Sequence, residues 1–176
     1  MDFVLRTPVD MIGYVMMAVP LTLFIVSPVS GWLYDIIGAR FLTTTGLAIC
    51  CLSVISLSFL SPESTPLDIA WRLALLGTGQ SIFLSPNTAS VLAGIEKEYT
   101  GITSGMLATS RNIGMLSGVA IVGMVFTAFF SFFSGGLDLK EFSSLHINAF
   151  MYSFQCTLGI TAVLALAGGI LSVLQE

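Results

Sequence analysis

The chain has 176 residues, of which 55% are hydrophobic and only 9% are charged, and its formal net charge is −4. Soluble domains carry about a quarter charged residues, so this composition excludes an ordinary soluble protein and favours one whose surface faces a lipid bilayer. So few charges also argue against nucleic acid as a partner, because such binding needs clustered Lys and Arg. We therefore expect an all-α membrane protein.

Five stretches of the sequence lack Asp, Glu, Lys and Arg, and each is long enough to cross a bilayer as a helix. A hydrocarbon core of about 30 Å requires roughly 20 helical residues. We predict five transmembrane helices in a single domain over residues 1–176, an odd number that places the termini on opposite sides of the membrane. The predicted spans are residues 11–34, 41–60, 70–92, 103–130 and 148–174.

Prolines and acidic residues mark bends and connectors along these spans. Residues 1–10 are a short polar connector without a leader sequence. Pro20 and Pro28 lie inside the first predicted helix, where each removes a backbone donor, so we expect kinks there. Residues 61–68 contain two prolines and two acids and predict a solvated turn. Trp71 then opens the third helix at the depth of the membrane interface.

The basic residues do not orient the predicted helices in the membrane. Arg40 and Lys97 lie in connectors on one side, whereas Arg6 and Lys140 lie on the other, with Arg72 close by. The positive-inside rule requires an excess of Lys and Arg in the loops of one side. This count therefore leaves the orientation open.

The connector between the first two predicted helices concentrates glycine and charge. It reads Gly31-Trp-Leu-Tyr-Asp35-Ile-Ile-Gly38-Ala-Arg40. Gly31 allows two helices to approach, and Gly38 supplies a backbone conformation that only glycine adopts cheaply. Asp35 can accept hydrogen bonds from the amino end of a neighbouring helix, although Asp is also ordinary in turns. Arg40 can pair with acids nearby.

This connector resembles the signature loop of the major facilitator superfamily, usually written G-x-L-a-D-r-x-G-r-r. Ile36 and Ala39 stand where the family often has basic residues, which weakens the ion-pair network and leaves the turn intact. A second stretch resembles the penultimate helix of the drug:proton antiporters in that superfamily. It comprises Pro86-Asn87, Gly101-x-x-Ser104-Gly105, Arg111-Asn112-x-Gly114 and Gly118-Val-Ala120.

The resemblance implies helices two to six of a C-terminal half, with Asp35, Arg40 and Lys97 in the cytoplasm. It implies a carrier in the plasma membrane of a bacterium, in which Gly31 to Arg40 form a gating loop. Carriers of this kind bind substrate between two halves that rock about the site. The N-terminal half and the first helix of this half are therefore expected as missing partners, together with a small-molecule substrate and protons in the full-length parent.

Four polar residues inside the predicted helices are candidates for the substrate path: Gln80, Asn87, Arg111 and Asn112. Arg111 is functional by default, because a charge at the bilayer centre costs at least about 2.5–3.5 kcal/mol. Alternatively, the buried span begins at Asn112 and Arg111 extends to the interface. Gln80 and Asn87 share one helix face, where they bind a ligand or bond another helix for about 0.6 kcal/mol each.

The predicted fourth helix carries two pairs of glycines with small-xxx-small spacing, Gly101 with Gly105 and Gly114 with Gly118. Such pairs let helix backbones approach closely in membranes. We expect these four glycines to pack the helix against its neighbours, with dimerisation as the alternative.

The residues needed for catalysis or for cofactor binding do not gather in this sequence. His146 alone cannot build a metal site. The run Gly77-Thr-Gly79-Gln-Ser-Ile82 lacks the third glycine of a dinucleotide loop, and no strand precedes it. The predicted spans contain no Asp or Glu to relay protons, so we expect the titrating group of a proton-coupled parent in the missing portion. We predict no enzyme, no cofactor and no metal.

The leading hypothesis is therefore a fragment of a proton-coupled multidrug exporter that works by alternating access. The alternative is a small membrane scaffold, or a half-transporter that acts only when paired with another membrane protein. The exporter hypothesis predicts an open reading frame that continues upstream with about seven to nine further spans. Sequencing the DNA upstream of Met1 tests this, and an intact promoter and start at Met1 would favour the alternative.

Overall fold

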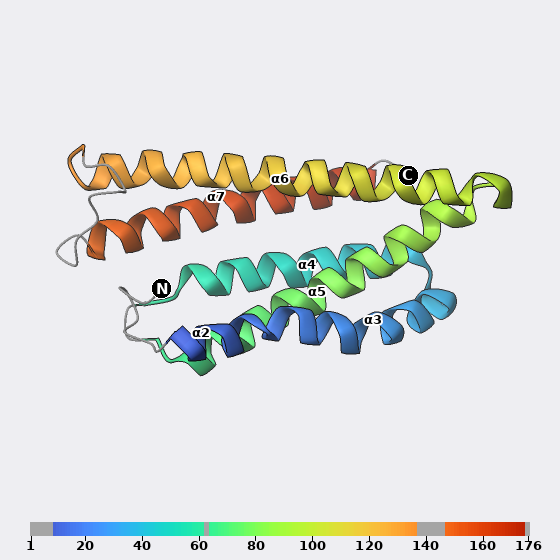
Figure 1. Ribbon diagram of the computed structural model, residues 1–176, viewed down its shortest axis with the longest axis horizontal. Coiled ribbons are helices and arrows are strands. Elements are labelled where there is room, and N and C mark those ends of the chain that lie inside the picture. Colours follow the sequence, from blue (N-terminus) through green and yellow to red (C-terminus); the bar gives the residue numbers. More distant parts are fainter. Residues whose placement is uncertain (1–8, 62–63, 137–146, 175–176) are drawn as a thin grey trace.

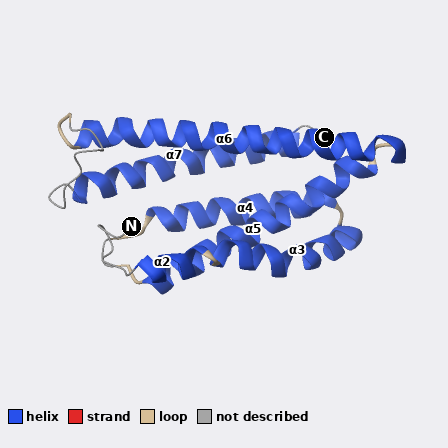
Figure 2. Cartoon of the chain, viewed as in Figure 1, coloured by secondary structure: helices blue, strands red, loops and turns tan. Residues whose placement is uncertain are grey.

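The computed structural model describes residues 9–61, 64–136 and 147–174, and this part of the chain is helical without a strand (Figures 1 and 2). The all-helical class with five long helices is confirmed, the first of them divided in two. The elements are α2 (Val9–Met16), α3 (Ala18–Ile37), α4 (Ala39–Ser58), α5 (Pro66–Ala93), the 3-10 helix η1 (Lys97–Tyr99), α6 (Thr100–Phe133) and α7 (Ile147–Leu174).

The first predicted helix is interrupted at Met17, between α2 and α3. Pro20 accounts for the bend, because it has no N–H to donate to the carbonyl of Met16 four residues earlier. The flanking hydrogen bonds continue, with Met17 donating to Gly13 at 3.1 Å and Leu21 donating to Met17 at 3.1 Å. Pro28 lies inside α3 without ending it. The interruption therefore stems from Pro20, and α2 and α3 together correspond to the single predicted span.

Four helical segments of the described chain are long and apolar enough to cross a membrane: Met11–Ile37, Ala39–Ser58, Lys97–Phe133 and Ile147–Ala167. The fifth helix, α5, has 28 residues and packs most extensively against α4 and α3. At about 1.5 Å per residue it is as long as its neighbours. It contains more small and polar residues, because its surface contacts other helices rather than lipid.

The helices run side by side, and the chain turns at alternate ends of the bundle (Figure 1). The α3–α4 turn and η1 lie at one end, whereas the α4–α5 connection and the carboxyl end of α6 lie at the other. The connectors that contain Arg40 and Lys97 therefore lie at the same end of the bundle, as the sequence predicts. The opposing loop charges Asp138, Lys140 and Glu141, together with His146, lie outside the described residues, as do Asp2 and Arg6.

The amino end of α5 is closed by a capping box. The Thr65 hydroxyl accepts from the Asp68 backbone N–H at 3.3 Å, and the Asp68 carboxylate accepts from the Thr65 N–H at 3.0 Å. Pro66 occupies the first helical position, where its missing N–H costs nothing. The hydrogen bonds from Thr65 hold the pKa of Asp68 below its usual range. These local contacts explain why the helix begins four residues before the predicted span.

Glycine allows α5 to touch both of its neighbours through the backbone. A methyl group added at Gly79 would lie 2.8 Å from the Cys50 backbone nitrogen of α4 and 2.9 Å from the Gly46 carbonyl oxygen. A methyl group at Gly77 would lie 2.7 Å from the Val19 carbonyl oxygen of α3. Real Cβ atoms do not come this close, so α5 is held between α3 and α4 at positions that admit only glycine.

Several serines of the described chain are buried, whereas many large apolar side chains are exposed. Ser30, Ser53 and Ser81 are at most 2% exposed, whereas Phe24 is 80% exposed. The Ser53 hydroxyl donates to the Arg72 carbonyl at 2.7 Å, which joins α4 to α5. The α6–α7 hairpin contacts the rest mainly through α7, which packs on α4, with a smaller contact between α6 and α5, and most of α6 is exposed. This distribution suits a bundle surrounded by lipid.

Replacing Gly38 tests the turn between α3 and α4. Gly38 is the one residue between the two helices, and its φ of 88° and ψ of 164° lie in a region essentially restricted to glycine. We expect Gly38→Ala to lower the free energy of unfolding by about 1–3 kcal/mol, measured by SDS titration in mixed micelles. Gly13→Ala is the control, because a methyl group there meets nothing within 4 Å. Equal stability of the two variants would contradict this account.

Replacing the interhelical glycines tests the α4–α5 contact. We expect Gly46→Ala and Gly79→Ala each to destabilise the bundle by about 1–3 kcal/mol, because overpacking forces the backbones apart. Gly159→Ala in α7 is the matched control, since its methyl group would meet nothing within 4 Å. The same SDS titration measures all three variants. Wild-type stability of Gly79→Ala would show that α4 and α5 are not in backbone contact.

Candidate functional site

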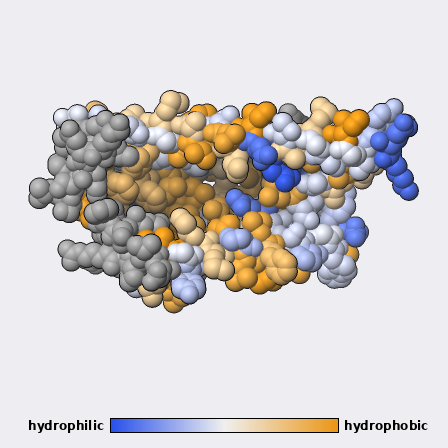
Figure 3. Space-filling view, in the orientation of Figure 1, coloured by the Kyte–Doolittle hydropathy of each residue, from blue (hydrophilic) through white to orange (hydrophobic). Residues whose placement is uncertain are grey.

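A pocket of about 400 Å³ opens between α3, α5 and α6 and is lined in part by polar side chains. Hydrophilic atoms lie on the middle part of α6 beside this space, within a largely apolar face (Figure 3). Its volume is within the range of small-molecule sites. It is lined by Leu23 and Ser27 of α3, by Ser81, Leu84, Ser85, Thr88 and Ala89 of α5, and by Arg111 of α6.

Arg111 connects α6 to α5 across this pocket. Its Nη2 donates to the Thr88 hydroxyl at 3.0 Å. The Thr88 hydroxyl in turn donates to the Leu84 carbonyl at 2.8 Å, one turn earlier on α5. With its proton committed to Leu84, the hydroxyl oxygen presents a lone pair to Arg111. Arg111 therefore lies at the pocket rather than extending away from the bundle.

Two buried hydroxyls of the bundle have no hydrogen-bond partner in the structure. Ser81 on α5 is 2% exposed and lines the pocket, and Ser30 on α3 is 1% exposed and does not line it. A buried polar group without a partner costs free energy. Ser81 is therefore an unused donor and acceptor at the wall of a polar pocket.

The structure separates the predicted substrate-path residues. Arg111 lines the polar pocket, whereas Gln80, Asn87 and Asn112 do not. Gln80 and Asn87 are half-buried on α5, and Asn112 is exposed on α6. Sequence reasoning missed the pocket hydroxyls of Ser81, Ser85 and Thr88. Their spacing of four and three residues on one helix face was the available signal.

The glycines of α6 do not make the close contacts expected of them within the described chain. A methyl group added at Gly101, Gly105, Gly114 or Gly118 would meet nothing within 4 Å. The close-packing glycines of this structure are Gly46, Gly77 and Gly79 instead. Packing through α6 stays a prediction, since the surface it would contact is outside these residues.

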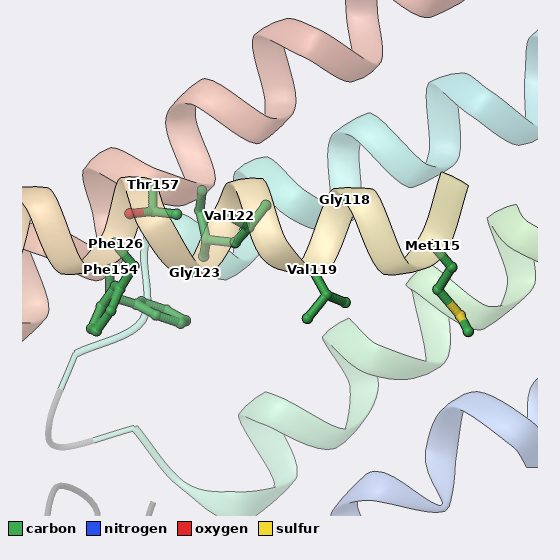
Figure 4. Close-up of a pocket in the computed structure, with 9 residues that line it drawn as sticks. Met115, Gly118, Val119, Val122, Gly123, Phe126, Phe154 and Thr157 are labelled. Carbon is green, nitrogen blue, oxygen red and sulfur yellow. The ribbon is translucent and has the colours of Figure 1, made fainter. Parts of the chain in front are cut away.

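A second pocket of about 500 Å³ lies between α6 and α7 and is almost entirely apolar. Figure 4 shows Phe126 and Phe154 beside each other at one end and Met115 at the other, with Val119 between them. The Phe126 ring also meets Phe150 edge-on, with centroids 5.2 Å apart. Gly118 and Gly123 lie in its wall. This pocket offers dispersion contact and little polar recognition.

The predicted gating loop spans the end of α3 and the start of α4. A methyl group added at Gly31 would lie 3.7 Å from the Ser85 hydroxyl, so Gly31 is in ordinary van der Waals contact with α5. Gly38 donates its N–H to the Tyr34 carbonyl at 2.9 Å and adopts the positive φ expected of it. Asp35 and Arg40 are exposed at this end. The contact proposed between Asp35 and a helix amino end is not among the hydrogen bonds of the described residues.

Comparison with the sequences of known proteins assigns this chain to a family. The family model described as Major Facilitator Superfamily matches residues 3–119. The chain is 30% identical over 164 residues to "Riboflavin transporter RibZ" of Clostridioides difficile (strain 630), covering 93% of this chain and 34% of the relative. It is 33% identical over 110 residues to "Uncharacterized transporter YebQ" of Escherichia coli (strain K12), covering 62% of this chain and 24% of the relative.

A third relative is "Multidrug resistance protein Stp" of Mycobacterium tuberculosis (strain ATCC 25618 / H37Rv). Identity is 35% over 107 residues, covering 61% of this chain and 20% of the relative. The chain thus spans about a third or less of the curated relatives it matches. These transporters and the apolar helices indicate a multi-pass protein of the cell membrane. The chain belongs to the Major Facilitator Superfamily.

Proposed function

We propose that this chain forms five helices of the C-terminal half of a proton-coupled carrier that exports small organic molecules by alternating access. The observation that carries the proposal is the polar pocket that Arg111 lines on α6, a helix that packs mainly on α7 and little on the rest of the bundle. Carriers built from two repeats bind their substrate at the repeat interface. The pocket would then form one wall of a site whose other wall comes from the missing N-terminal half.

The names of the relatives support a small organic substrate. One relative is named for riboflavin and another for multidrug resistance. The two pockets that α6 lines differ in chemistry, one polar and one apolar. An amphipathic organic molecule could place its polar group near Arg111 and its apolar body along Val119 and Phe126. A surface of this kind suits substrates of varied shape.

The coupling proton would bind outside the predicted membrane spans of this chain. The predicted spans contain no Asp or Glu, so they hold no group that titrates readily within the membrane. The gating loop over residues 31–40 would act instead as a latch at the cytoplasmic face. Its Asp35, exposed at this end, would pair with a group of the other half when the carrier closes on that side.

A transport assay with a matched pair of threonines tests the proposal. Thr88 and Thr78 both lie half-buried on α5 and both donate to the carbonyl four residues earlier at 2.8 Å, but only Thr88 contacts Arg111. In proteoliposomes containing the intact carrier, we expect Thr88→Val to lower kcat/KM about tenfold, the value of a hydrogen bond to a charged group. Thr78→Val should transport like the wild type.

The same proteoliposomes test proton coupling. Ethidium, a cation, and fluorescein, an anion, are the probes, and we expect an imposed pH gradient to drive the accumulation of at least one of them and a protonophore to abolish it. Equal transport by Thr88→Val and Thr78→Val would remove the pocket from the substrate path. Accumulation that survives the protonophore would reject proton coupling while leaving the carrier assignment in place.

A further inference from the structure

We propose that the polar pocket binds an anionic group, so that the preferred substrate of this carrier is an organic acid bearing a carboxylate or phosphate oxygen. The proposal rests on the proposed transport function and specifies the substrate class of the same site. It is carried by three features of the pocket: its charge, the fixed position of the Arg111 guanidinium and the unpartnered hydroxyl of Ser81.

The charge of the pocket is positive. Arg111 is the only charged residue among the eight that line it. The described acids of this chain lie near helix ends or in connectors: Asp10 in the first turn of α2, Asp35 in the last turn of α3, Asp68 in the first turn of α5, Glu96 before η1 and Glu98 within it. Because like charges repel and opposite charges attract, Arg111 disfavours a cation beside it and favours an anion.

The guanidinium is held in position with most of its donors unused. A guanidinium has five N–H donors in a rigid planar arrangement that matches a carboxylate or phosphate. The contact with Thr88 uses Nη2 and joins the guanidinium to α5, which Gly77 and Gly79 fix between two helices. Other N–H groups remain for a ligand. Such pre-positioned donors favour oxyanions over neutral groups.

Ser81 supplies a second donor at the pocket. It is on α5 with Ser85 and Thr88, and its hydroxyl is buried without a partner. If the buried Ser81 hydroxyl turns toward the pocket, a ligand bound at Arg111 could accept a hydrogen bond from it as well. This would satisfy a group that the protein alone leaves unsatisfied. The site therefore has both a charge and a neutral donor for the same anion.

The matched dyes fluorescein and rhodamine 123 share a xanthene scaffold and carry opposite charge, so they separate charge from shape. Binding to the intact carrier in detergent is followed by fluorescence anisotropy. We expect the wild type to bind fluorescein at least about tenfold more tightly than rhodamine 123. Arg111→Gln should weaken fluorescein binding by about 10- to 100-fold without weakening the binding of rhodamine 123. Arg111→Lys, which keeps the positive charge, should retain part of the fluorescein affinity.

Serine variants provide a second, independent readout. Ser81→Ala should weaken fluorescein binding by about two- to tenfold. Ser30→Ala is the matched control, because Ser30 is equally buried and unpartnered but does not line the pocket. Thermal unfolding of both variants shows whether they fold. A binding defect in Ser81→Ala that Ser30→Ala lacks supports direct contact with the ligand.

Two results would overturn the proposal. One is rhodamine 123 binding as tightly as fluorescein in the wild type, and the other is fluorescein affinity that Arg111→Gln does not change. The second result would also arise if an acidic residue from another part of the carrier already paired with Arg111, and in that case too the proposal would be wrong. Gradient-driven transport of rhodamine 123 with no anion preference would leave the proposed function standing and reject this inference. Arg111-dependent fluorescein binding without any transport would do the reverse.

Discussion

The close approach of α5 to α3 and α4 is the constraint on which the rest of this structure depends. In lipid, helices gain nothing by hiding apolar side chains, so association relies on dispersion contact and on hydrogen bonds between backbones and small side chains. Gly46, Gly77 and Gly79 provide that approach, with carbonyl oxygens less than 3 Å from where a methyl group would stand. The Ser53 hydroxyl adds a hydrogen bond across the same contact. The five-helix arrangement follows from this tight centre.

The same constraint places the polar residues. A helix held through glycine and serine turns these small residues inward and leaves its remaining polar side chains at the seams between helices. Ser81, Ser85 and Thr88 therefore open on the space beside α6, and Arg111 reaches them from the other side. The polar pocket is a consequence of how α5 packs. Its chemistry and its position both derive from one helix that is less apolar than its neighbours.

Much of the fold was predictable because it depends on local sequence. The charge-free lengths indicated each helix, and the glycine at position 38 indicated its turn, since both effects act within a few residues. Arg111 was also predictable, because its charge is unusual in an apolar helix. Its partner Thr88 was not, since that contact joins residues 23 positions apart.

The glycine pattern shows where such prediction fails. The small-xxx-small spacing of its glycines indicated α6 as a closely packed helix, but this spacing says nothing about which helix lies opposite. In the described chain, a methyl group added at the glycines of α6 would meet nothing within 4 Å. Gly77 and Gly79 pack at the centre of the bundle instead, although in the sequence they only resemble an incomplete dinucleotide loop. Close packing is a property of two surfaces. A one-dimensional pattern contains only one of them.

The most direct test of this account is the sidedness of the connectors. In a chain whose native cysteines are replaced by serine, single cysteines at Arg40, Lys97 and Ser64 would be labelled with a membrane-impermeant maleimide in right-side-out and inverted vesicles. The account predicts that positions 40 and 97 label from one side and position 64 from the other. Labelling of positions 40 and 64 from the same side would contradict the alternating bundle.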